Sequence, residues 1–207
     1  MQAESAVPPS DRRKWPPHCC VPAYVHAALA GFGVSVETPS VLPSLLGVHV
    51  GPNDENPLGL PVTSDDSVRG MTASGASKAV PELLKALGSP LSFRHVRFNE
   101  IPFALYEDIL RAALESRVAS AAGVKWSAFD RSPGASDALH LLRVTSFDGG
   151  MVSLFDDSRE CEPPEMKRPW QELESAVLAA ADGFWFIGSK ADLNHLLSPI
   201  YRGSDTA

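Results

Sequence analysis

Three residues of this chain have the types and the spacing of a thiol-based catalytic centre: Cys20, His140 and Asp156. Cys20 precedes an apolar run that contains Pro22, and proline is favoured in the first turn of a helix. Cys20 is therefore expected at a helix N-terminus, where unpaired N–H groups and the helix dipole stabilise a thiolate. A thiolate in that position is a nucleophile, and a nucleophile of this kind needs a base.

His140 and Asp156 are the candidates for the base and for the acid that orients it. His140 opens an apolar strand directly after a polar loop, and Asp156 ends the next strand. The two strands are joined by Asp-Gly-Gly at 148–150, which is typical of a hairpin. Since the start of one hairpin strand lies beside the end of the other, His140 and Asp156 are predicted neighbours. Asp157 is an equally acidic neighbour of Asp156.

The elements that must position these residues follow from composition and periodicity. Residues 1–17 are expected to be an extended lead-in, and residues 18–207 a single domain. Residues 51–77 are rich in Gly, Pro, Asn, Asp and Ser and are expected to be a long loop that could shape a binding cleft. Helices are predicted at 22–31, 39–46, 77–87, 102–116 and 170–181, and strands at 91–98, 118–129, 140–146, 151–155 and 183–188, before a short polar tail.

Helices come first and strands dominate the second half without regular βαβ alternation, so the fold class is α+β. Ser74 and Ser77 are the candidate caps of the helix at 77–87. The acidic residues of the long loop are expected to form a solvated face; they are Asp54, Glu55, Asp65 and Asp66.

The order of these features resembles the papain-like cysteine peptidase superfamily. The resemblance rests on the Cys-Val-Pro-Ala run at 20–23 opening a helix, on His140 opening a strand, and on Asp156 closing the next strand. Within the superfamily, the chain looks most like the bacteriocin leader-processing peptidases that cut after a double glycine, and their stand-alone relatives. The likeness extends from Trp15 to Ser189, and it implies an N-terminal helical half packed on a C-terminal antiparallel sheet.

The resemblance implies that Cys20 is the nucleophile, His140 the general base and then acid, and Asp156 the orienting carboxylate. The implied activity is that of a cysteine peptidase, amidase or acyltransferase, which acts through an acyl-enzyme on a peptide, an amide or a carrier-bound acyl group. The family usually has Gln six residues before the nucleophile as an oxyanion donor, whereas this chain has Lys14. Losing one such donor commonly costs about 100- to 1000-fold in rate.

Two hypotheses follow from Lys14. Either Lys14, Trp15 or His18 takes over the role of the missing oxyanion donor, or the chain is a catalytically silent papain-like binding module. A buried structural role for Cys20, and Cys19 as the nucleophile, are further alternatives.

A zinc site made of His18, Cys19, Cys20 and Cys161 is disfavoured. Adjacent cysteines do not readily bind one ion in tetrahedral geometry, and the chain has no Cys-x-x-Cys pair. No metal and no cofactor are therefore expected.

Composition limits the partners and the compartment. Eighteen Lys and Arg against 25 Asp and Glu give a formal charge of −7, which argues against nucleic acid and anionic lipid as partners. The sequence has neither the pattern of a signal peptide nor a continuous apolar run of membrane-spanning length, so we expect a cytoplasmic protein. Its three cysteines are too few and too oddly placed for a disulfide framework.

Overall fold

The chain divides into two compact units. The computed structural model describes residue 15 and residues 18–36, 41–65, 69–102, 105–130, 137–158 and 164–203. One unit, called the helical unit here, contains Ala6–Ser89 and Phe155–Met166. The other, called the sheet unit, contains Pro90–Leu154 and Lys167–Ala207. The single domain expected from residue 18 stays a prediction.

The helical unit contains the helices α1 (Cys20–Gly31), α2 (Leu42–Leu45) and α3 (Ala73–Ala86). α1 buries eight of its residues, and apolar side chains on all sides of a helix indicate that it lies inside a core. α3 begins earlier than predicted because Thr72 caps it: the Thr72 hydroxyl accepts the Gly75 N–H at 3.1 Å. Ser74 and Ser77 lie within the helix, so the expectation that they cap it is wrong.

The long loop between α2 and α3 is tied together at its base. His49 and Gly70 form an antiparallel bridge with hydrogen bonds of 2.8 and 3.2 Å, and Val50 bridges Val62. The loop is as irregular as predicted, but these main-chain bonds give its two ends a defined separation.

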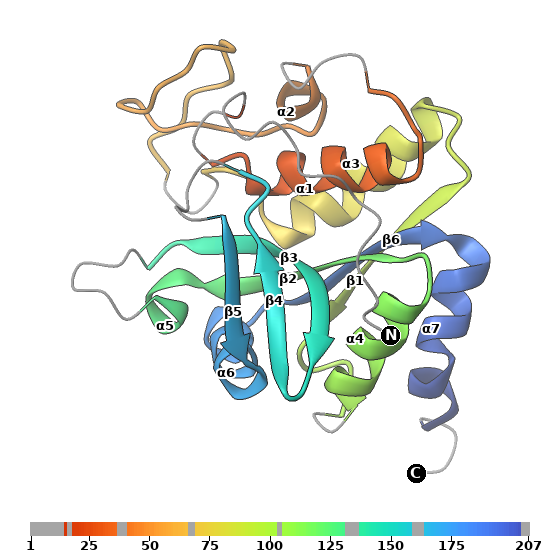
Figure 1. Ribbon diagram of the computed structural model, residues 1–207. Helices are drawn as coiled ribbons and strands as arrows, with labels where there is room; N and C mark the ends of the chain where they lie inside the picture. Colours follow the sequence, from red (N-terminus) through yellow and green to blue (C-terminus); the bar gives the residue numbers. More distant parts are fainter. Residues whose placement is uncertain are drawn as a thin grey trace. The chain divides into compact units, whose positions relative to one another are not determined.

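The sheet has six strands in the order β1-β6-β2-β3-β4-β5 (Figure 1). β6 pairs antiparallel with both β1 and β2, and β2 pairs antiparallel with β3. β3 passes into β4 through Gly149 and Gly150, whose φ angles of 57° and 76° suit the tight turn of a hairpin. The predicted hairpin is therefore confirmed. The strands are β1 (Leu91–Arg97), β2 (Ala119–Lys125), β3 (Leu139–Asp148), β4 (Met151–Phe155), β5 (Glu165–Pro169) and β6 (Gly183–Ser189).

Helices α4 (Tyr106–Glu115), α6 (Trp170–Ala180) and α7 (Lys190–Gly203) lie on one face of the sheet (Figure 1). The polar tail predicted after the last strand is wrong, because α7 follows directly. The Ser189 hydroxyl accepts the Asp192 N–H at 3.0 Å and donates to the Asp192 carboxylate at 2.6 Å, which caps this helix. Strand β5 was likewise not predicted.

The strand predicted at 118–129 ends early, at Lys125, and continues as the short helix α5 (Trp126–Phe129). The Trp126 N–H donates to the Ala138 carbonyl at 3.0 Å, and the Trp126 carbonyl accepts the Asp130 N–H at 2.7 Å. Apolar residues therefore continue past the strand, but the backbone has turned into a helical conformation.

Asp182, just before β6, joins three strands of the sheet. It accepts hydrogen bonds from His95 Nε2 at 2.6 Å and from Trp185 Nε1 at 3.3 Å. A Cβ at Gly123 on β2 would meet the Asp182 carboxylate at 2.0 Å, so the glycine is what admits the carboxylate. The carboxylate is largely buried, and its donors offset the cost of removing it from water.

Within the part of the chain that the structure describes, the helices are too short or too polar to cross a membrane.

Candidate active site

Cys20 is the first residue of α1 and is partly exposed, whereas Cys19 before it is fully buried. Cys19 occupies the N-cap position, and no side chain caps the helix there. The Cys19 carbonyl accepts the first helical hydrogen bond, from the Ala23 N–H at 2.9 Å. Cys20 thus lies where a helix presents N–H groups without intrahelical partners, as the Pro22 pattern predicts. Its role as a nucleophile stays a prediction.

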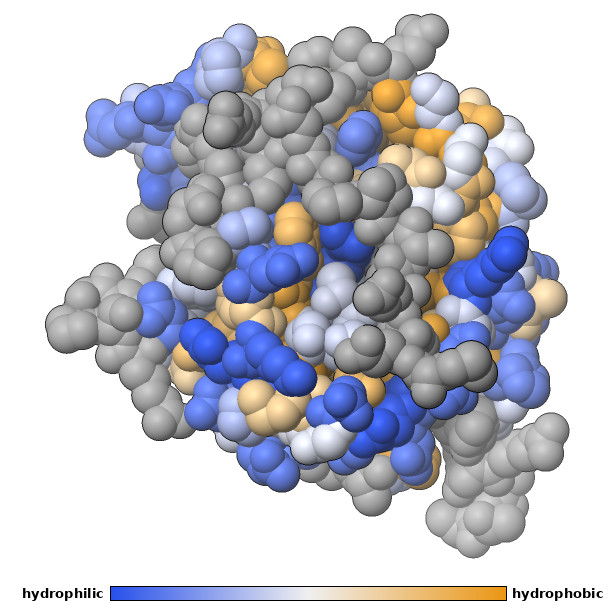
Figure 2. Space-filling model, in the orientation of Figure 1, coloured by the Kyte–Doolittle hydropathy of each residue, from blue (hydrophilic) through white to orange (hydrophobic). Residues whose placement is uncertain are grey.

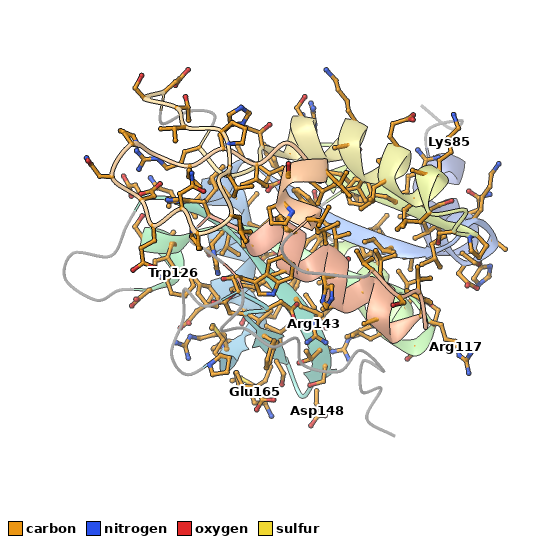
Figure 3. The ribbon with its side chains drawn as sticks, turned by 90° about the horizontal axis from the view of Figure 1, so that it is seen from above. Lys85, Arg117, Trp126, Arg143, Asp148 and Glu165 are labelled. Carbon is orange, nitrogen blue, oxygen red and sulfur yellow. The ribbon has the colours of Figure 1, made fainter. Side chains whose placement is uncertain are left out.

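His140 is the second residue of β3 and is 4% exposed. Its imidazole and the Trp126 ring on α5 form a T-shaped contact, with 5.3 Å between the ring centroids. Trp126 lies at the end of the sheet where β2 passes into α5, and Arg143 lies further along β3 (Figure 3). An aromatic side chain packed against an imidazole restricts its rotation.

The start of β3 is also tied to α5 by polar contacts. The Asp137 carboxylate accepts a hydrogen bond from the Ser127 hydroxyl and lies 3.3 Å from Lys125 Nζ. These two partners lower the pKa of Asp137 below its usual value, with the hydroxyl contributing most. The strand that carries His140 therefore begins at a defined place on the sheet.

Asp156 is fully buried, and its carboxylate is held by Ser158. Asp156 Oδ1 accepts the Ser158 N–H at 2.9 Å and the Ser158 hydroxyl at 2.6 Å, while the Asp156 N–H donates to the Pro164 carbonyl at 2.9 Å. Asp157 is 2% exposed, so burial alone does not choose between the two acids. Ser158 is a residue whose part the sequence analysis missed, although Asp-x-Ser after a strand is a signal for an Asx turn.

Buried polar residues are concentrated in the two stretches predicted for the base and the acid. Of the six buried polar or charged residues that the structure describes, five are His140, Arg143, Asp156, Asp157 and Ser158, and the sixth is Ser120. Burying such groups costs free energy, and their clustering along the chain is typical of functional sites. Cys20 and Asp156 belong to the helical unit and His140 to the sheet unit, so the meeting of all three is a proposal.

Two of the three candidate replacements for the oxyanion glutamine lie within the described chain. Trp15 is 1% exposed and packs its ring against His26, at 5.5 Å between centroids, so it belongs to the core. The His18 side chain is 31% exposed, and its Nε2 lies 3.0 Å from Asp54 Oδ2. Lys14 lies outside the described residues. Of Trp15 and His18, only His18 has a side chain that a substrate could reach.

The pairing with His18 corrects the expectation for Asp54. The Asp54 side chain is 19% exposed, accepts the Gly51 N–H at 2.5 Å, and lies 3.7 Å from Arg69 Nε. It does not belong to a solvated acidic face; it joins the turn before Cys20 to the long loop.

An open groove of about 380 Å³ lies in the sheet unit beside α5. The Arg168 guanidinium lies over the Phe129 ring at 5.6 Å, and its Nε is 3.9 Å from Glu172. Figure 2 shows strongly hydrophilic residues next to pale orange ones on the surface over β5, the strand that supplies Lys167 and Arg168 to the groove. Phe129 contacts Trp126, which contacts His140, so two aromatic rings connect the groove to the candidate base.

A second hollow in the sheet unit is an apolar crevice between α4, α6 and β6. Its volume of about 10 Å³ has room for no more than one water. Burial, with a smaller contribution from Glu100, raises the pKa of Tyr106 to about 12. Burial and the nearby Glu107 raise the pKa of Glu174. The crevice is therefore part of the packing of the unit and is too small for a substrate.

Metal-binding side chains do not gather in threes among the described residues, and Cys161 of the disfavoured zinc site lies outside them.

The topology of the sheet and the order of the helices define an α+β protein with a papain-like fold. A crystal structure presented as that of a candidate C39-like peptidase from Bacillus anthracis matches with a TM-score of 0.57. The match covers 90% of this chain and 97% of that chain at 13% sequence identity, so it shows the fold. No family model and no curated protein matches the sequence. The predicted fold class is confirmed.

Proposed function

We propose that this protein is a cysteine peptidase-like enzyme that cleaves an amide or thioester through Cys20. The observation that carries the proposal is a partly exposed cysteine at the uncapped first residue of a core helix, in a protein with a papain-like fold. The structural neighbour, itself presented as a candidate C39-like peptidase, supports peptidase chemistry in general. Helix-terminal N–H groups favour a thiolate and later an oxyanion at this position.

In the proposed mechanism, the Cys20 thiolate attacks the substrate carbonyl while His140 is protonated. The tetrahedral oxyanion accepts hydrogen bonds from N–H groups at the start of α1. The C–N bond then breaks as His140 donates its proton to the leaving amine, and a thioester to Cys20 remains. Water, deprotonated by His140, attacks the thioester, and the Cys20 thiolate leaves; an amine in place of water gives acyl transfer. Asp156, oriented by Ser158, would hold the His140 ring in the required tautomer.

The groove beside α5 supports a peptide-like substrate over a long acyl chain. Its lining includes four charged side chains, those of Asp130, Lys167, Arg168 and Glu172. An apolar chain would gain little by leaving water there, whereas a peptide offers hydrogen-bonding groups and side chains of either charge.

The proposal is tested by thiol reactivity, which needs no knowledge of the substrate. Iodoacetamide at neutral pH, followed by peptide mass spectrometry, should modify Cys20 at least about tenfold faster than Cys161 in the folded protein, because a thiolate is the reactive species. Cys19 should stay unmodified because it is buried. The matched controls are the Cys20→Ala variant and the urea-unfolded protein. In the unfolded protein, all three thiols should react at the same rate. Equal and slow labelling of Cys20 and Cys161 in the folded protein would favour the catalytically silent binding module.

A further inference from the structure

His18, two residues before Cys20, has an unusual backbone conformation. Its φ of 63° lies in the left-handed region, which only one other non-glycine residue of the described chain adopts, Ala181. A side chain with a Cβ resists this conformation, and it persists only where surrounding contacts hold it. The contacts of His18 should therefore show what fixes the turn that leads into α1.

One contact that holds the His18 side chain comes from Asp54. The distance from His18 Nε2 to Asp54 Oδ2 is 3.0 Å, and the carboxylate is in turn fixed by the Gly51 N–H at 2.5 Å, with Arg69 Nε at 3.7 Å. The Gly51 amide donates a hydrogen bond to Asp54, and the Arg69 guanidinium lies at ion-pair distance from it; both groups belong to the long loop. Asp54 is thereby oriented before it meets His18, and it can transmit that orientation to the turn.

Gly70 allows the loop to approach the turn this closely, and Gly51 leaves room for the Arg69 side chain beside Asp54. A Cβ at Gly70 would lie 3.3 Å from the His18 carbonyl oxygen and 3.4 Å from the His18 Cβ, and Gly70 has a φ of 76°. A Cβ at Gly51 would lie 2.5 Å from the Arg69 guanidinium. Gly70 is itself fixed by its two hydrogen bonds to His49. The loop therefore braces both the backbone and the side chain of His18.

We infer that Asp54 is a positioning residue for Cys20, acting through His18. The inference rests on the proposed function of Cys20 as the nucleophile. Cys19, between His18 and Cys20, is fully buried, so the short segment is anchored by the core on one side and by Asp54 on the other. Without the carboxylate, His18 would be released from the left-handed conformation, and the peptide groups at the start of α1 would turn away from the thiol. The long loop thus sets the reactivity of Cys20.

The experiment compares the rate and the pH profile of Cys20 alkylation in the wild type and in Asp54→Asn. The variant should react about twofold to fivefold more slowly at neutral pH, the size of effect expected when a partly exposed polar contact is lost, and the midpoint of its profile should move to higher pH. Asp54→Glu, which keeps the charge, should recover part of the rate. Asp65→Asn removes the same charge from an exposed position of the same loop and is the matched control.

A second variant separates the backbone effect from a loss of folding. Glycine adopts the left-handed conformation freely, so His18→Gly should keep more of the reactivity than Asp54→Asn does, and adding Asp54→Asn to it should change the rate less than twofold. Circular dichroism checks folding, and if Asp54→Asn alone does not fold, Asp54→Glu and His18→Gly carry the comparison. The inference is overturned if Asp54→Asn has the pH profile of the wild type. It is also overturned if Asp54→Asn lowers the alkylation rate as much in the His18→Gly background as it does alone. Either result leaves the proposed role of Cys20 as nucleophile intact. If Cys20 of the wild type is alkylated no faster than Cys161, both the inference about Asp54 and the proposed function of Cys20 are overturned.

Discussion

Ser158 donates two hydrogen bonds to a single oxygen of Asp156, one from its N–H at 2.9 Å and one from its hydroxyl at 2.6 Å. Both residues are fully buried. Two donors on Oδ1 fix the plane of the carboxylate and thereby the direction of its other oxygen, Oδ2. Orientation of this kind is what a carboxylate needs if it is to hold an imidazole in one tautomer.

Ser158→Ala removes the hydroxyl and leaves the Asp156 carboxylate with one fewer donor. The free energy of unfolding should fall by about 1–3 kcal/mol, because a buried acceptor loses part of its satisfaction. Urea unfolding measures this, and the rate of Cys20 alkylation should fall with it if Asp156 orients His140. Ser175→Ala is the matched control, since its hydroxyl bonds the Gln171 carbonyl on the exposed side of α6. A variant as stable as the wild type would show that the N–H bond alone suffices.

His140→Ala tests the base. If the protonated imidazole stabilises the Cys20 thiolate, its removal should move the midpoint of the alkylation pH profile to higher pH and slow the reaction at pH 7 about tenfold or more. His195→Ala, at an exposed position of α7, is the control and should leave the profile where it is. An unmoved profile in His140→Ala would exclude His140 from the proposed role.

Asp182→Ala should be one of the more damaging substitutions in the sheet unit. It leaves His95 and Trp185, both buried side chains on neighbouring strands, without the acceptor that they share. A buried donor left without its acceptor typically costs about 1–3 kcal/mol, and two are affected here, which urea unfolding can measure. Asp108→Ala, an exposed acid of α4, is the control and should cost less than about 1 kcal/mol. If the urea unfolding midpoints of Asp182→Ala and Asp108→Ala are similar, the role given to Asp182 is contradicted.

Tyr106 makes stability depend on alkaline pH. Its pKa of about 12 in the folded state lies above the unfolded value of 10.0, so the folded protein retains a proton that the unfolded chain has lost. Tyr106 therefore contributes about 2 kcal/mol to the free energy of unfolding. This contribution is fully present below pH 10 and is lost as the pH rises toward 12. Tyr106→Phe should flatten this part of the curve of unfolding free energy against pH. It also removes the hydrogen bond to the Arg97 carbonyl, at 3.1 Å, so its stability near pH 8 should be about 1 kcal/mol lower. If the slope of unfolding free energy against pH above pH 10 is unchanged in Tyr106→Phe, the slope arises from other groups.

Local sequence patterns were sufficient for most of the fold. The alternation of residues in β1, the Asp-Gly-Gly turn between β3 and β4, and the apolar run of α1 each depend on neighbours within a few residues, so they could be predicted directly. The prediction failed where a local signal was missed, as at α7, or where a contact with a distant residue outweighed the local pattern, as at α5. Ser189 and Asp192 have the spacing of a capping box for α7. The apolar side chains of α5 look like a continuing strand until the contact with Ala138 is known.

For the candidate site, the sequence by itself determined the residue types, the position of Cys20 at a helix start, and the hairpin that carries His140 and ends one residue before Asp156. Only the tertiary structure showed that Trp126 packs on His140 and that Asp54 meets His18. The last of these joins residues far apart in the chain, and it depends on the close approach of the loop to the turn at Gly70. Periodicity describes which face of an element is buried. It does not describe which distant side chain lies within 3 Å of another, because that distance is set by the packing of the whole unit.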